Sequence, residues 1–158
     1  AVLRWLMGSM EPVRYSTIGW LAVVVIPVVI YIFSKARLWN LMAVGEDWAA
    51  ARGASTARLM LTGFIAGSLL TGTVTALTGP IGFLGLIVPH TLRIAWGADH
   101  RLLIPASFLV GASFLTVCDT LARTVMAPAE IPVGVITAML GGPFFIWLLR
   151  SRRRRLWL

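Results

Sequence analysis

Long runs without a charged residue dominate the chain, and short charged stretches separate them. Residues 15–34 form an uncharged run of twenty and residues 59–92 one of thirty-four. Two further runs cover residues 102–118 and 131–149. Twenty apolar residues in a helix rise about 30 Å, which is the thickness of the hydrocarbon core of a bilayer. The pattern therefore predicts helices that cross a membrane.

The run over residues 59–92 is too long for one crossing. Its interior holds Thr78-Gly79-Pro80, a helix-breaking sequence, which divides it into a full helix and a shorter one. We expect an all-α, polytopic membrane helical bundle with short cytoplasmic coupling helices, which forms a single transmembrane domain over residues 1–158. The expected spans, with residues 1–10 as the tail of a sixth, are 15–34, 59–77, 81–95, 102–125 and 131–149.

Composition agrees with a membrane protein and changes the meaning of the net charge. The chain is 58% hydrophobic and only 13% charged, whereas soluble domains are about a quarter charged. The net charge of +8 would otherwise favour a nucleic-acid partner. Five of the fourteen basic residues, however, lie in the tail 150–158, directly after an apolar run. This arrangement favours contact with anionic lipid and argues against nucleic acid.

Basic residues also predict the orientation of the spans. One set of alternate loops and the C-terminal tail carries eleven of them, and the opposite side carries three, Arg4, Arg14 and Arg123. Cytoplasmic loops are enriched in Lys and Arg. We therefore expect the C terminus and the loops around residues 35–58 and 93–101 to be cytoplasmic.

Several kinds of chemistry have no matching motif. The chain has no GxxxxGK[ST] phosphate-binding loop, so it is not expected to hydrolyse ATP itself. His90, His100 and Cys118 lack the spacing of a metal site, and Cys118 is the only cysteine, so no internal disulfide can form. No nucleophile stands beside a base. An enzyme, a metal site and a cofactor site are not expected.

The segment from Gly79 to Arg93, GPIGFLGLIVPHTLR, resembles the signature of the FecCD permease family. Further matching segments occur in the family's order along the chain: Trp5–Ser9, Leu41–Glu46, Gly97–Arg101, Leu103–Pro105, Gly111–Ser113, Asp119, Ala122–Arg123, Glu130–Gly134, Thr137–Ala138 and Gly141–Pro143.

The resemblance implies the permease subunit of an ABC importer for ferric siderophores, haem or cobalamin, located in the bacterial inner membrane. It implies three protein partners: a separate ATP-binding subunit, a periplasmic substrate-binding protein and a second permease copy. Family permeases are longer, and the match is to their second half. The chain, which begins without Met, is therefore expected to be part of a longer protein.

The stretch 38–57 is the expected coupling loop. Ala49 to Ala51 favour a short helix, with acidic residues at its start and Gly53 suited to end it. The resemblance implies that Gly45, Glu46, Ala50 and Gly53 contact the ATPase subunit. The alternative is a helix that rests on lipid headgroups.

Three ionisable residues near or within spans are the remaining candidates. Asp119 and Arg123 are four residues apart, a spacing that allows an ion pair on one helical face. The resemblance implies that Arg123 docks the binding protein; the alternative is a structural ion pair. His90, after Pro89, belongs either to a gate or to the packing of its helix.

Two other functions are compatible with a membrane bundle. An ion-coupled secondary transporter needs ionisable residues deep in its spans, and Asp119 is the only acid in a predicted span. A membrane assembly subunit that transports nothing would not explain the ordered motifs.

Overall fold

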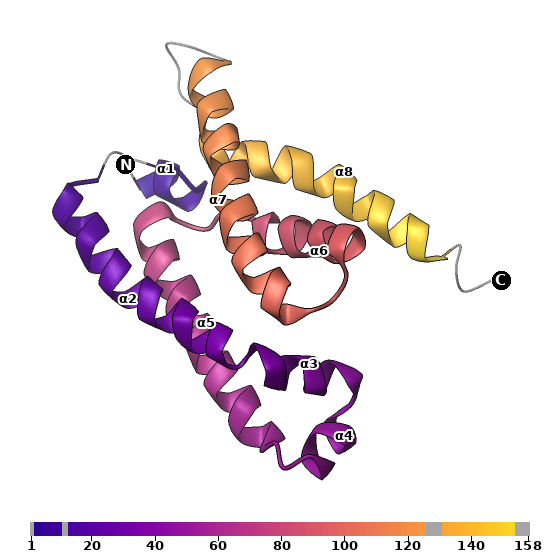
Figure 1. Ribbon diagram of the computed structural model, residues 1–158. Helices are drawn as coiled ribbons and strands as arrows, with labels where there is room; N and C mark the ends of the chain where they lie inside the picture. The colour runs from indigo at the N-terminus through magenta and orange to yellow at the C-terminus, as the bar shows by residue number, and fades with distance from the viewer. Residues whose placement is uncertain (1, 11–12, 126–130, 154–158) are drawn as a thin grey trace.

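The computed structural model describes residues 2–10, 13–125 and 131–153, and within these ranges every regular element is a helix (Figure 1). The helices follow one another as α1 (Val2–Leu6), α2 (Tyr15–Ser34), α3 (Ala36–Val44), α4 (Glu46–Ala51), α5 (Thr56–Thr78), α6 (Leu84–Trp96), α7 (His100–Thr124) and α8 (Val133–Arg153). The predicted all-α fold is confirmed.

Three of these helices, α2, α5 and α7, are each long and apolar enough to cross a membrane. The apolar part of α8 within the described residues, Val133–Leu148, is shorter. Helix α6 has 13 residues and rises only about 20 Å, less than the hydrocarbon thickness of about 30 Å. The number of membrane crossings, predicted as five, stays a prediction.

The break predicted at Thr78-Gly79-Pro80 is confirmed, because α5 ends at Thr78 and Gly79 has a φ of +70°. The following helix, predicted from residue 81, begins only at Leu84. Phe83 explains the delay: its φ of +65° is left-handed, a conformation that no residue inside a right-handed helix adopts.

A cluster of buried hydrophobic side chains lies where α6 packs against α7. Val88 and Leu92 of α6 pack with Leu103 of α7, and Leu84, Ala106 and Phe114 surround them. Helix α2, by contrast, has no buried residue and exposes Trp20, which is 75% accessible. Apolar surface on this scale requires lipid or further protein to cover it.

Candidate functional site

The predicted coupling loop is built from two short helices at the C-terminal end of α2 (Figure 1). Helix α4 covers Glu46–Ala51, as expected. Short cytoplasmic coupling helices were expected, and helix α3, Ala36–Val44, is the one whose residues the sequence reasoning did not assign. Gly45 separates the two helices with a φ of +156°, which only glycine adopts readily. Its conformation fixes the angle at which α4 leaves α3.

Helix α4 is ended by the glycine that was predicted to end it. The N–H of Gly53 donates to the carbonyl of Ala50 at 2.9 Å, and the N–H of Ala54 donates to the carbonyl of Ala49 at 3.0 Å. This pair of bonds is a Schellman motif, which needs a left-handed residue, and Gly53 has a φ of +79°. The helix end is therefore set by the backbone.

Three of the four candidate coupling residues lie on the outside of this element, and the fourth, Gly45, is half-buried. Glu46 and Ala50 are exposed, and a Cβ placed on Gly53 would meet nothing within 4 Å. The inner side is held by Ala49, which is fully buried. The Arg52 guanidinium lies 5.9 Å from the centre of the exposed Trp48 ring, a cation–π distance. Helix α4 therefore presents charged, aromatic and small residues together on an open surface.

The start of α7 contacts α3 through three residues, Asn40, Asp99 and His100, which we call the amide junction. The Nδ2 of Asn40 donates to Oδ1 of Asp99 at 2.7 Å. The Oδ1 of Asn40 accepts the backbone N–H of His100 at 2.8 Å and lies 2.7 Å from its Nδ1. An amide oxygen only accepts, so Nδ1 of His100 carries the proton.

Asp99 has a second task, because its Oδ1 accepts the N–H of Arg101 at 2.9 Å and so caps α7. The Asn40 amide, followed by the backbone N–H of Arg101, holds the pKa of the Asp99 carboxyl below its usual value of 3.8. Both donors favour the ionised carboxylate. Asp99 and His100 belong to the matched segment Gly97–Arg101, whereas sequence reasoning did not single out Asn40.

Three glycines bring distant segments of the chain together near the C-terminal ends of α5 and α7. We call these three residues, Gly8, Gly79 and Gly134, the glycine junction. The N–H of Gly134 donates to the carbonyl of Gly8 at 2.9 Å, and the N–H of Ser9 donates to the carbonyl of Thr78 at 2.9 Å. A Cβ on Gly79 would collide with the carbonyl oxygen of Trp5, and one on Gly134 with that of Met7. The glycines were not predicted to meet.

Asp119 and Arg123 form the predicted ion pair beside this junction. The Nε of Arg123 lies 2.8 Å from Oδ2 of Asp119, and its Nη2 donates to the carbonyl of Met10 at 2.7 Å. The arginine side chain is 41% exposed. Its guanidinium therefore has two fixed partners and still reaches the surface.

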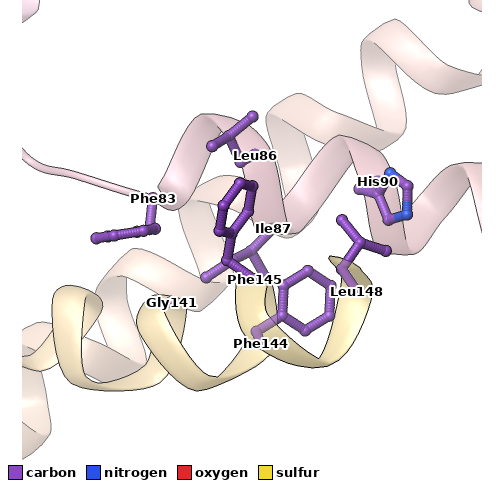
Figure 2. A pocket seen from close by; sticks show the side chains of 8 residues that line it. All are labelled: Phe83, Leu86, Ile87, His90, Gly141, Phe144, Phe145 and Leu148. Carbon is purple, nitrogen blue, oxygen red and sulfur yellow. The ribbon is translucent and has the colours of Figure 1, made fainter. Parts of the chain in front are cut away.

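His90 lies elsewhere, beside a small cavity of about 50 Å³ between α6 and α8 (Figure 2). Its ring contacts Phe144 edge-on, with 6.5 Å between centroids. The lining is otherwise aliphatic, aromatic or glycine: Phe83, Leu86, Ile87, Gly141, Phe144, Phe145 and Leu148. The structure brings His90 together with neither the coupling residues nor Arg123.

In the part of the chain that the structure describes, no three His, Cys, Asp or Glu side chains lie close enough to hold a metal ion. Cys118 is buried, 1% exposed, inside α7. Glu130, one of the residues behind the resemblance, lies outside the described residues, as does most of the basic tail 150–158.

Known proteins give a consistent comparison. The model of the FecCD transport family matches residues 1–151. The hemin transport system permease protein HmuU of Yersinia pestis is 43% identical over 96% of this chain and 46% of its own length. The vitamin B12 import system permease protein BtuC of Escherichia coli is 40% identical over 97% of this chain and 47% of its own length.

A solved structure, a metal-chelate type ABC transporter in an inward-facing conformation, superimposes with a TM-score of 0.85 at 34% identity. The match covers 95% of this chain and 48% of that one. The chain thus spans about half the length of the relatives it matches. Because the family model matches nearly all of its residues, the chain belongs to the FecCD transport family.

Proposed function

We propose that this chain is the second half of the permease subunit of an ATP-driven importer that moves a ferric siderophore, haem or cobalamin across the bacterial inner membrane. The observation that carries the proposal is the family match over residues 1–151, with named haemin and vitamin B12 permeases as relatives. The three helices long enough to cross a membrane support it.

In this proposal the C terminus and α3–α4 face the cytoplasm. Eleven of the fourteen basic residues fall on that side of the predicted topology, and such residues are retained on the cytoplasmic side. A separate ATP-binding subunit contacts Gly45, Glu46, Ala50 and Gly53. The open surface of α4 supports this assignment, because a protein partner needs accessible side chains.

A periplasmic binding protein docks at the other end of the bundle, where Arg123 is the proposed contact. Its exposed guanidinium suits an acidic side chain on that partner. Asp119 orients Arg123 rather than conducting ions, since the pair is already made at 2.8 Å. The edge-on contact of His90 with Phe144 supports a packing role for His90.

Transport then proceeds by alternating access between two permease copies. ATP binding moves the ATPase subunits, the subunits move α4, and the pathway opens first to one side and then to the other. This chain contributes helices, the coupling element and the docking residue, while the chemistry of ATP hydrolysis belongs to the partner.

The test is purification of the full-length permease from membranes, followed by reconstitution with its ATPase subunit and binding protein. We expect the ATPase subunit to copurify and haemin or cobalamin uptake into proteoliposomes to require ATP. Uptake driven by a proton gradient without ATP would support an ion-coupled transporter instead. Stable membrane insertion without any copurifying ATPase would indicate an assembly subunit.

A further inference from the structure

Two consecutive residues of α3 contact two different long helices. Trp39 lies against Gly63 of α5, where a Cβ would collide with the indole ring. Asn40 bonds to Asp99 and His100 at the start of α7. Successive side chains on a helix point about 100° apart, so α3 is held from two sides. A displacement of α3 is therefore expected to move both α5 and α7.

The contact with α5 depends on the absence of a side chain at Gly63. Gly67, one helical turn further along, has nothing within 4 Å of its Cβ position. The two glycines have the GxxxG spacing that is typical of close helix packing in membranes. Only Gly63 has a partner at that distance, the indole of Trp39 on α3.

The contact with α7 uses both ends of the Asn40 amide. The oxygen accepts from His100, and the nitrogen donates to the Asp99 carboxylate. A carboxylate at position 40 could accept but not donate, and a hydrocarbon could do neither. The amide junction therefore requires a side chain that donates and accepts at once.

Helix α3 is also joined firmly to α4. Gly45 ends α3 and is the N-cap of α4, where its carbonyl accepts the first hydrogen bond of α4 from the N–H of Ala49 at 3.1 Å; Ala49 is fully buried. Gly45 connects the two helices in a conformation that other residues adopt only with strain. A force on the exposed side of α4 is thus carried into α3 without a flexible linker.

We propose that Asn40 and Trp39 are positioning residues that transmit displacement of α4 to α7 and α5 at the same time. This inference rests on the proposed function, in which α4 receives the motion of the ATPase subunit. It assigns to α3 the role of connecting that motion to two helices that are far apart in sequence. The α6–α7 connection, through Asp99, becomes part of the moving unit.

The first measurement uses the full-length permease alone in lipid nanodiscs. We expect Asn40→Asp to raise hydrogen–deuterium exchange in α3, because it places a carboxylate against that of Asp99. The double variant Asn40→Asp with Asp99→Asn reverses the two groups, restores the donor and acceptor, and should restore protection. Unchanged exchange in Asn40→Asp would overturn the amide junction itself, whatever the ATPase does.

The second measurement uses the reconstituted complex with its binding protein and haemin as the probe. Asn40→Asp should lower binding-protein-stimulated ATP hydrolysis about tenfold, as for the loss of one charge-assisted hydrogen bond, with basal hydrolysis unchanged. The double variant should recover most of the stimulation. Gly63→Ala should also lower stimulation, whereas the matched Gly67→Ala should not.

Three outcomes would contradict the inference. Stimulation could fall only in proportion to the amount of assembled complex, which would leave a purely structural role. The reversed pair could regain exchange protection without regaining stimulation, which would separate the contact from transmission. A wild-type permease that binds no ATPase subunit would overturn the proposed function and this inference with it, while the exchange measurement would still report on the contact.

Discussion

The two ends of the bundle are joined by different kinds of contact. The amide junction and Trp39 use side chains, namely an amide, a carboxylate, an imidazole and an indole. The glycine junction uses backbone groups of three segments, brought together because no Cβ separates them. Side chains can change rotamer and exchange partners, whereas a backbone carbonyl moves only with its segment.

This difference indicates which end of the bundle can adjust its contacts when the helices move. A hydrogen bond between side chains contributes about 1 kcal/mol net, and rotamer changes allow the bonded groups to stay in contact while their helices move. A methyl group added at the glycine junction would meet backbone atoms, which cannot rotate away. We therefore expect the glycine junction to be a fixed reference point and the amide junction to be the adjustable one.

The largest effect is expected at the glycine junction. Gly79→Ala introduces a Cβ against the carbonyl of Trp5, at φ +70° and ψ −178°, a region that is almost restricted to glycine. The loss in free energy of unfolding should exceed about 3 kcal/mol, because backbone strain and steric overlap add. Thermal unfolding of the full-length permease in detergent would measure it. Gly72→Ala in α5, where nothing lies within 4 Å, is the control, and equal unfolding temperatures would refute a rigid junction.

The next effect concerns docking at the same end. Arg123→Glu reverses the charge and breaks the bonds to Asp119 and Met10. Affinity for the binding protein should fall at least about tenfold, and more at low salt, because screening weakens charge interactions. Titration of labelled binding protein at two ionic strengths would measure it. An unchanged affinity would leave only the structural ion pair.

A smaller effect on stability is expected at the end of α4, on the side of the amide junction. Gly53→Ala places a Cβ in open space, so its cost is that of a left-handed φ, about 1–2 kcal/mol. Exchange should rise locally in α4, with little change in the unfolding temperature. The bulkier Gly53→Trp should abolish ATPase coupling without affecting membrane insertion. Normal transport by that variant would remove Gly53 from the coupling surface.

The smallest effect is expected from pH. The pKa of Asp99 is lowered in the folded protein, so its contribution to stability is complete above the usual value of 3.8 and is lost only as the pH falls through the lower folded value. The contribution of Asp99 to the protection of α3 should therefore be constant from about pH 8 to about pH 5. Burial lowers the pKa of His100 below its usual 6.5, so a loss of protection that begins as the pH falls below 6.5 belongs to His100. Asp99→Asn should abolish the loss of exchange protection at acid pH. A loss of protection near neutral pH would indicate that a group other than Asp99 titrates.

Local features of this structure follow from the sequence, and long-range contacts do not. The uncharged run at residues 15–34 coincides with α2, and the ion pair of Asp119 and Arg123 lies within one helical turn. The residues of helix α3 were not assigned from the sequence, because Arg37 and Asn40 interrupt its apolar positions. The partners of Gly8 and Asn40 are 126 and 59–60 residues away, respectively, and no local pattern specifies such pairs.

The five residues between α5 and α6, Gly79 to Phe83, affect how far water is expected to reach into the bundle. In the predicted topology, where residues 81–95 form a span, helix α6 is about 10 Å too short for the hydrocarbon core, so part of this non-helical connection is expected at membrane depth. Peptide groups outside a helix cannot face lipid chains without a hydrogen-bonding partner. The carbonyl of Gly82 accepts the N–H of Leu84 at 2.8 Å, and peptide groups of this connection that lack such a partner would require solvent or the remaining protein. Hydration should reach further into the bundle here than along α2, and this connection would be the first place to seek ordered water.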